Sequence, residues 1–225
     1  MSPRSKLKKL RFALAGTGAM ANFHAQQLNA IPGVKIAAVC DVDEARVREF
    51  AAKYGVEEIY TDFDALLRQA DFDALANVTP DAFHAPLTLK ALAAKKHVLC
   101  EKPLATHYAD AKKMADAAKK AGVIHLVNFS YRKSGALQKA REFIQAGRIG
   151  RVVHVEGSYL QSWLACDIWG PWRTTPAWLW RQSTRHGSKG VLGDVGVHLI
   201  DFASFPVGPI QKVHARLKTF TGIKG

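Results

Sequence analysis

Short apolar segments alternate with amphipathic segments along residues 1–127 of the chain. The apolar segments are nearly continuous, which is typical of strands that are buried on both faces of a parallel sheet. The segments between them carry apolar residues at helical spacing, so each strand is expected to be followed by a helix that covers the sheet. The predicted strands span 11–15, 34–40, 74–78, 97–100 and 124–127, and the predicted helices span 19–30, 44–54, 63–69, 82–93 and 108–121.

The pattern changes after residue 127. The predicted elements are a helix over 135–146, a longer alternating strand over 151–161, a helix over 195–205 and a final strand over 210–220. We therefore predict an α/β fold with two domains. Residues 1–127 form a doubly wound parallel sheet, and residues 128–225 form a short α+β domain.

The 225 residues are 48% hydrophobic and 23% charged, as in an ordinary globular protein. The formal net charge is +13, from 32 Lys and Arg against 19 Asp and Glu. The lysines are not interleaved with aromatic residues, so they do not resemble a base-stacking surface. We expect a solvated basic surface that attracts anionic cofactors or substrates, and no nucleic-acid partner.

The cysteines Cys40, Cys100 and Cys166 are widely spaced and odd in number. Such a set indicates neither a disulfide framework nor a zinc site, and it fits a reducing compartment. The basic residues at the start lack the apolar stretch of a signal peptide, and no apolar run approaches the length of a membrane span. The sequence therefore predicts a cytoplasmic protein with no metal and no membrane partner.

A glycine turn joins the first predicted strand to the first predicted helix. Residues 16–21 read Gly-Thr-Gly-Ala-Met-Ala, a G-x-G-x-x-A pattern. Gly16 permits the tight turn, Gly18 leaves the backbone open to a pyrophosphate, and Ala21 lets the helix pack close to its strand. The N–H groups and the dipole at the helix start favour phosphate. We expect a dinucleotide at this turn, contacted by Gly16, Thr17, Gly18, Ala19 and Met20.

An acidic residue ends the second predicted strand. Asp41 follows Gly16 by 25 positions, where a carboxylate can accept hydrogen bonds from the ribose hydroxyls of NAD and repel the 2′-phosphate of NADP. NAD is therefore favoured over NADP, although the nearby Arg46 moderates that preference. Together, the strand, turn, helix and acid indicate a Rossmann cofactor domain; a purely structural glycine turn is the alternative.

Polar residues also follow the next two strands. Thr79 comes directly after the strand 74–78, and Lys102 comes two residues after Cys100. Since the carboxyl ends of parallel strands meet at one edge of the sheet, both side chains are expected at the cofactor edge. Taken alone, Lys102 is typical of a solvated lysine before a turn proline.

Asp194 and His198 stand four residues apart, on one face of a predicted helix. They are candidates for substrate positioning and proton transfer. Taken alone, the pair is more typical of a helix N-cap and a hydrogen-bonded core histidine. Two such residues are too few for a zinc site.

These motifs together resemble the Gfo/Idh/MocA oxidoreductase family. The resemblance covers the turn at 16–21, Asp41, the segment 77–80 with His84, Glu-Lys-Pro at 101–103 and Asp-x-x-x-His-x-x-Asp at 194–201, in the family's order. It implies a Rossmann domain, a truncated form of the family's C-terminal domain and a cis bond between Lys102 and Pro103. It also implies a cofactor pocket that includes Thr79, Pro80, His84, Glu101 and Lys102.

The resemblance further implies three catalytic roles. Lys102 is expected beside the nicotinamide and the reacting carbon, Asp194 is expected to orient the substrate, and His198 is expected to exchange the hydroxyl proton. Alcohol oxidation requires a hydride to leave carbon, which nicotinamide accepts, while a proton leaves oxygen. An imidazole suits the proton transfer, and a lysine cation stabilises a developing alkoxide.

The loop before Asp194 is rich in tryptophan, with Trp163, Trp169, Trp172, Trp178 and Trp180. These rings either bury their own faces over the sheet or form the wall of a sugar pocket, in which Arg173, Arg181 or Arg185 contacts the ligand. Trp180-Arg181 resembles a family pair, and Tyr131-Arg132 resembles the family's aromatic-basic pattern. The expected substrate-binding residues are Tyr131, Arg132, Trp180 and Arg181.

Family members continue through a larger antiparallel sheet, whereas this sequence stops after its second long predicted strand. Two strands alone expose hydrogen-bonding edges and an apolar face. We therefore expect either a truncated version of the domain or a homo-oligomer that forms through the C-terminal sheet.

The predicted function is that of an NAD-dependent oxidoreductase. As a dehydrogenase or reductase, it transfers a hydride between nicotinamide and a secondary hydroxyl or carbonyl of a sugar, polyol or related small molecule. NAD-assisted glycoside hydrolysis, and a non-catalytic NAD-binding sensor or scaffold, are the alternatives.

Overall fold

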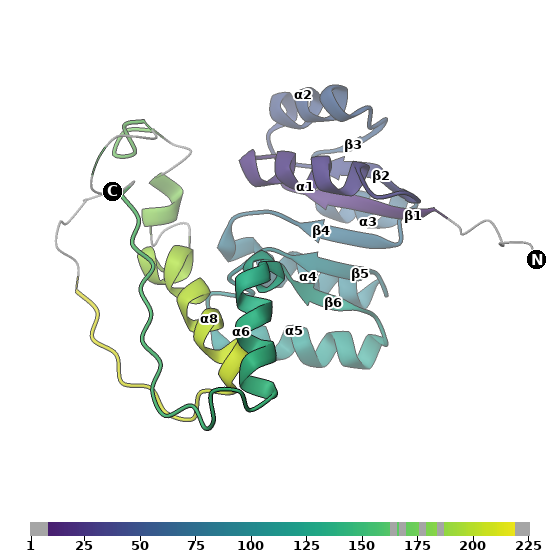
Figure 1. The fold of residues 1–225 in the computed structure, drawn as a ribbon. Coiled ribbons are helices and arrows are strands. Elements are labelled where there is room, and N and C mark those ends of the chain that lie inside the picture. The colour runs from purple at the N-terminus through teal and green to yellow at the C-terminus, as the bar shows by residue number, and fades with distance from the viewer. Residues whose placement is uncertain (1–8, 163–165, 167–169, 176–178, 184–186, 219–225) are drawn as a thin grey trace, which may run out of the picture. The chain divides into compact units, whose positions relative to one another are not determined.

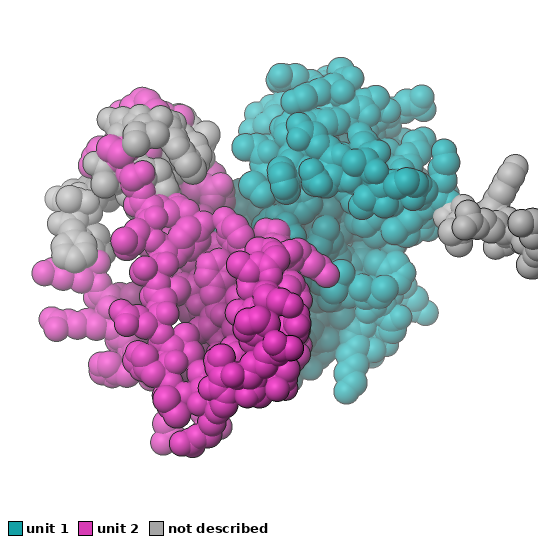
Figure 2. Space-filling model, in the orientation of Figure 1, with its two compact units in different colours: residues 1–128 teal, residues 129–225 magenta. Residues whose placement is uncertain are grey.

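The computed structural model describes residues 9–162, 166, 170–175, 179–183 and 187–218. The chain divides into two compact units, residues 1–128 and residues 129–225 (Figure 2). Trp163, Trp169, Trp178 and Arg185, which the sequence analysis singles out, lie outside the described residues. Within the described part of the chain, no helix is both long and apolar enough to cross a lipid bilayer.

Unit 1 contains a six-stranded parallel sheet with the strand order β3-β2-β1-β4-β5-β6 (Figure 1). Its strands are β1 (Leu10–Ala15), β2 (Val34–Cys40), β3 (Glu58–Tyr60), β4 (Ala74–Asn77), β5 (His97–Cys100) and β6 (His125–Val127). Its helices are α1 (Ala19–Asn29), α2 (Glu44–Tyr54), α3 (Phe63–Gln69), the 3-10 turn η1 (Asp81–Phe83), α4 (His84–Ala93) and α5 (Tyr108–Ala121). The predicted doubly wound sheet is confirmed. The three-residue strand β3 is too short to give a periodic pattern, and the sequence did not predict it.

Alternate residues of the central strand β1 face opposite sides of the sheet, as strand geometry requires. Ala13 and Ala15 pack with residues of α3, α4 and α5, whereas Leu14 packs with residues of α1 and α2. All three side chains are at most 1% exposed. Helices therefore cover both faces of the sheet, which is why its strands read as continuous apolar runs.

The direction in which strands are added reverses between β1 and β4, which pair with each other. Doubly wound sheets bind ligands beside such a reversal, at the carboxyl ends of the strands. Main-chain hydrogen bonds continue past the strand ends here, from Val78 N to Ala15 O (2.8 Å) and from Gly16 N to Cys40 O (2.9 Å). We call this row of strand ends, from Gly16 and Asp41 to Thr79, Glu101 and Asn128, the carboxyl edge.

Unit 2 is helical in its described residues. It contains the 3-10 turns η2 (Ser130–Lys133) and η3 (Trp180–Gln182), the π-helical turn η5 (Leu192–Gly196), and the helices α6 (Gly135–Gln145) and α8 (Val197–Val207). The helix α6 packs against α8. The predicted helices over 135–146 and 195–205 are confirmed, with ends shifted by at most two residues.

The predicted strands over 151–161 and 210–220 are wrong for the residues that the structure describes. Residues 151–161 and 210–218 form no strand there. Alternation of apolar and polar residues shows only that one face of a segment can be buried, whereas a strand also needs a hydrogen-bonded neighbour. The segment around Gly157 lies instead against α8, where a Cβ on Gly157 would stand 2.9 Å from Leu199 Cδ1.

Candidate functional site

The turn after β1 depends on Gly16, because any other residue at this position would be strained. Gly16 has a φ of +87°, a left-handed value that side chains disfavour. A Cβ at this position would lie 2.7 Å from Val78 O and 3.0 Å from Thr79 N. The turn after β1 therefore touches the main chain that follows β4, where the strand order reverses.

The second glycine of the motif leaves open space at the start of α1. Gly18 is the N-cap residue of this helix and provides no side chain to cap it. A Cβ built on Gly18 would meet no described atom within 4 Å, and the first helical turn carries no acidic residue. Unlike Gly16, Gly18 is thus not required by the packing of the chain itself. The open backbone and the helix start fit a phosphate group.

Asp41 ends β2 at the same edge, and its carboxylate is held by the chain itself. Its Oδ2 accepts hydrogen bonds from Thr17 N and Thr17 Oγ1, both at 2.8 Å. Arg46 donates from Nη2 to Oδ1 at 2.6 Å and from Nε to Oδ2 at 3.2 Å. Burial raises the pKa of Asp41, but the bonds from Arg46, Asp43 N and Thr17 outweigh it and hold that pKa below its usual value. Asp41 is therefore an anion.

His84 connects the loops that follow β4 and β5. It is 1% exposed, and its Nδ1 lies 2.7 Å from Pro103 O while its Nε2 lies 2.8 Å from Thr79 O. Asn77, which is fully buried, accepts a bond from Thr79 Oγ1 at 2.7 Å. His84 and Asn77 thus hold Thr79 in place at the carboxyl edge.

A buried network surrounds the carboxylate of Glu101, one residue before Lys102. His24 Nε2 of α1 lies 2.7 Å from Glu101 Oε1, and Asn128 Nδ2 donates to the same oxygen at 2.7 Å. Lys102 N donates to Glu101 Oε2 at 3.1 Å. Burial raises the pKa of Glu101, but His24, Asn128 and Lys102 N together hold it below its usual value. The network fixes the main chain of Lys102 relative to α1 and to the end of β6.

The peptide bond between Lys102 and Pro103 is cis, as the family resemblance implies. Of the predicted cofactor residues, the structure brings Gly16, Thr17, Gly18, Asp41, Thr79, Glu101 and Lys102 to the carboxyl edge. Thr17 and Glu101 are at most 5% exposed. Their side chains support their neighbours, and Met20, which is 40% exposed, stands at the surface of α1.

In unit 2, His198 lies in the first turn of α8 within a group of aromatic rings. It is 7% exposed, and its ring centroid is 4.8 Å from that of Tyr131, 6.2 Å from that of Tyr159 and 6.4 Å from that of Phe202. The hydroxyls of Tyr131 and Tyr159 are 2.9 Å apart. This bond, followed by burial and the charge of Asp194, raises the pKa of Tyr131. Tyr131 therefore contributes a neutral hydroxyl beside His198.

Two predicted substrate-binding arginines are paired with carboxylates of their own unit. Arg132 Nε lies 2.9 Å and 3.0 Å from the two oxygens of Asp201, which is 5% exposed, and Nη2 makes a further short contact. Arg181 Nη1 donates to Asp194 Oδ1 at 3.0 Å and its guanidinium lies over the Trp180 ring. Both arginines thus hold acids in place.

Because η5 is π-helical, the spacing of Asp194 and His198 is not that of an α-helical turn.

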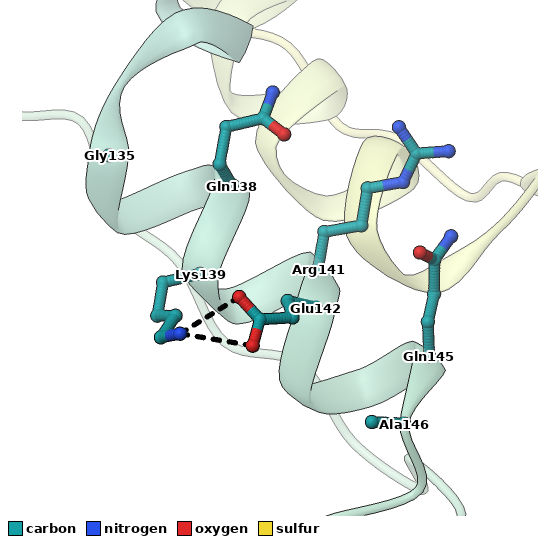
Figure 3. Close-up of a pocket in the computed structure, with 7 residues that line it drawn as sticks. All are labelled: Gly135, Gln138, Lys139, Arg141, Glu142, Gln145 and Ala146. Atoms are coloured by element: carbon teal, nitrogen blue, oxygen red, sulfur yellow. Dashed lines mark hydrogen bonds and ion pairs between the residues drawn. The ribbon is translucent and has the colours of Figure 1, made fainter.

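An open hollow of about 760 Å³ follows one side of α6 (Figure 3). Gln138, Arg141 and Gln145 project from the helix along it, and Lys139 and Glu142 form an ion pair with each other. The hollow is lined by α6 alone and contains none of the predicted site residues. We therefore do not assign it to the predicted site.

Among the described residues, no three His, Cys, Asp or Glu side chains form a group that could hold a metal ion. Cys40 and Cys100 are buried at the ends of β2 and β5. Burial raises the pKa of each thiol to about 12, so neither is a reactive thiolate near neutral pH.

The polar residues of these networks that were not predicted as site residues include His24, Asn128 and Asp201. His24 carries a readable signal, because it shares the buried face of α1 with Ala21, Ala25 and Leu28. A histidine on such a face needs a polar partner. The partners Glu101 and Asn128 follow it by 77 and 104 positions, so the pairing itself is not visible without the fold.

Two family models match successive parts of the chain. Residues 10–129 match the model described as an oxidoreductase family with an NAD-binding Rossmann fold. Residues 137–224 match the GFO/IDH/MocA C-terminal domain.

Levoglucosan dehydrogenase of Pseudarthrobacter phenanthrenivorans is 32% identical over 222 residues, which are 95% of this chain and 55% of that protein. Myo-inositol 2-dehydrogenase of Thermotoga maritima is 35% identical over 142 residues, which are 63% of this chain and 42% of that protein. The chain thus spans about half the length of the curated relatives it matches.

A solved structure of levoglucosan dehydrogenase in complex with NADH and levoglucosan has a TM-score of 0.78 to this chain at 30% identity. The match covers 88% of this chain and 54% of that one. The match to both domain models, in the order in which unit 1 and unit 2 follow each other, agrees with the glycine turn, the strand order and the cis Lys102–Pro103 bond. The chain therefore belongs to the Gfo/Idh/MocA oxidoreductase family and carries its NAD-binding Rossmann fold.

Proposed function

We propose that the protein is an NAD-dependent dehydrogenase or reductase that acts on a secondary hydroxyl or carbonyl group of a sugar or polyol. The observation that carries this proposal is the carboxyl edge, where the Gly16 turn, the anionic Asp41 and the Lys102 loop follow β1, β2 and β5, on the two sides of the reversal between β1 and β4. The relatives named above are dehydrogenases of a sugar derivative and of an inositol, which supports this substrate class. They give no support to the glycoside hydrolase alternative.

The Gly16 turn and the start of α1 hold the cofactor pyrophosphate in this proposal, and Asp41 holds the adenosine ribose. Bound NAD supplies the hydride acceptor. Lys102 stabilises negative charge on the reacting oxygen, and the Glu101 network keeps its main chain fixed. Thr79 and Pro80 border the cofactor, while His84 positions them.

His198 takes the hydroxyl proton, in an aromatic environment that excludes water. Asp194, held by Arg181, orients a substrate hydroxyl. The rings of Tyr131 and Trp180 offer faces to a sugar ring. Arg132 positions α8 through Asp201.

The test separates cofactor binding from turnover. NADH titration, followed by nicotinamide fluorescence, is compared in the wild type, in Lys102→Ala and in Lys119→Ala, an exposed lysine of α5 that serves as the matched control. Wild type and Lys119→Ala are then expected to reduce NAD in the presence of a polyol or sugar from a panel. Lys102→Ala is expected to bind NADH with nearly unchanged affinity and to lose most turnover.

Failure of the wild type to bind NADH contradicts the proposal. NADH binding with no turnover across the panel favours a sensor or scaffold instead. Release of a free sugar from a glycoside at constant NADH contradicts net redox chemistry.

We also propose that unit 2 self-associates. Its extended segments expose the apolar side chains Val153, Leu160, Val213 and Leu217, each at least 74% exposed. Exposed apolar side chains are typical of association sites where they gather into a patch. Sedimentation velocity at micromolar concentration is expected to show a dimer or larger species, and a monomer contradicts this part of the proposal.

A further inference from the structure

The carboxylate of Asp41 is already saturated by donors of the chain. Oδ2 accepts from Thr17 N, Thr17 Oγ1 and Arg46 Nε, and Oδ1 accepts from Asp43 N at 3.1 Å and from Arg46 Nη2. An ionised carboxylate offers about four lone-pair sites. A ribose hydroxyl that donates to Asp41 must therefore displace one of these five donors.

Arg46 is the donor that can leave. Thr17 is 3% exposed and the amide of Asp43 belongs to the main chain, so these donors are fixed by the turn after β1 and by the start of α2. The Arg46 side chain, in contrast, is 47% exposed. Its bonds to Asp41 are consequently the ones that a bound ribose replaces at the lowest cost in packing.

The charges around Arg46 show what it does once it leaves Asp41. Its Nη1 also lies 3.2 Å from Asp43 Oδ2, so one guanidinium neutralises part of two carboxylates in the described structure. A released guanidinium presents paired N–H donors, a geometry that matches a phosphate monoester. The next basic residue of α2, Arg48, is already paired with Glu44 at 2.8 Å and points elsewhere along the helix.

We propose that Arg46 is the cofactor-discriminating residue, and that through it the protein binds NADP(H) as well as NAD(H). With NAD(H), Arg46 competes with the ribose hydroxyls for Asp41 and so weakens binding. With NADP(H), Arg46 binds the 2′-phosphate and offsets the repulsion from Asp41. This inference rests on the proposed function, because it requires a dinucleotide at the carboxyl edge.

The test compares the dissociation constants of NADH and NADPH by nicotinamide fluorescence. The proteins are the wild type, Arg46→Ala, Arg46→Lys and the matched control Arg48→Ala, which removes an arginine of the same helix and breaks only an exposed ion pair. The wild type is expected to bind both cofactors. Arg46→Ala is expected to bind NADPH at least about 10-fold more weakly, since it loses the charge-assisted hydrogen bonds to the 2′-phosphate. Its NADH affinity is expected to stay the same or rise.

Arg46→Lys retains the charge without the paired donors, so its NADPH affinity is expected between those of the wild type and Arg46→Ala. Arg48→Ala is expected to match the wild type with both cofactors. NADH binding to the wild type without NADPH binding overturns the inference and leaves the proposed function intact. An equal loss of both affinities in Arg46→Ala also overturns it. A wild type that binds neither cofactor overturns the proposed function and this inference together.

Discussion

Replacement of His24 by Leu tests whether the Glu101 network stabilises unit 1. His24 and Glu101 side chains are 6% and 7% exposed and lie 2.7 Å apart. A leucine fits the apolar face of α1, but it removes the partner of a buried carboxylate. A buried polar group that loses a hydrogen-bond partner costs about 1–3 kcal/mol, and more where the group is charged. Asn128 Nδ2 and Lys102 N still donate to Glu101, but this carboxylate is charged, so we expect about 3 kcal/mol.

The assay is urea unfolding at neutral pH, followed by circular dichroism. With an m value of about 2 kcal/mol/M, the midpoint is expected to fall by about 1.5 M. The matched control is the double variant His24→Leu/Glu101→Met, which removes both members of the pair. It is expected to recover most of the loss, since apolar replacement of a whole buried pair is close to neutral.

The pH dependence supplies a second readout. The pKa of Glu101 is lowered in the folded protein, so its stabilising contribution is complete above the unfolded-state pKa and is lost as the pH falls through the folded-state pKa. The difference between wild type and His24→Leu is therefore expected to shrink as the solution is acidified below the unfolded-state value of about 4.3. A loss under about 1 kcal/mol at neutral pH, or a double variant less stable than His24→Leu, refutes this reasoning.

The remaining predictions concern the glycine turn and unit 2. Left-handed backbone strain alone is expected to cost Gly16→Ala about 1–2 kcal/mol in the free energy of unfolding. The loss is expected to be larger than that, because the new Cβ would also meet Val78 O at 2.7 Å. The same displacement of the turn is expected to weaken NADH binding. Gly55→Ala is the control for strain without a clash, because Gly55 has a φ of +67° and a Cβ there would meet no described atom within 4 Å. An equal loss of stability in the two variants, measured by urea unfolding, contradicts the steric argument. Arg132→Leu is expected to cost about 3 kcal/mol in thermal unfolding because it leaves the buried Asp201 unpaired. Lys139→Leu, which breaks the exposed Lys139–Glu142 pair, is expected to cost less than about 1 kcal/mol, and similar losses in the two variants contradict this distinction.

Local sequence patterns predict the parts of this molecule that depend on local physics. The apolar runs predict five of the six strands of unit 1, because burial on both faces leaves a continuous signal. The glycine turn is predicted by the conformations and close approaches that only glycine permits. The strand predicted over 151–161 was wrong, because alternation does not reveal whether a neighbouring strand exists.

The sequence predicted the positions of the site residues in the fold better than it predicted their side-chain partners. Asp41 and Lys102 lie at the expected edge, since they come one and two residues after the ends of β2 and β5. The sequence did not show that Arg46 occupies the Asp41 carboxylate or that Arg132 is paired with Asp201, 69 positions away. Side-chain pairing depends on rotamers and on distant residues, and neither leaves a periodic trace in the chain.

The central claim is that Lys102 and His198 serve the same chemical step. Turnover of a polyol or sugar found in the panel is measured for Lys102→Ala, His198→Ala and the double variant, with NADH affinity measured alongside. Groups that act as a unit are not additive, so the double variant is expected to lose little more turnover than the worse single variant, while all three bind NADH like the wild type. Losses that multiply in the double variant, or a single variant with unchanged turnover, contradict the claim.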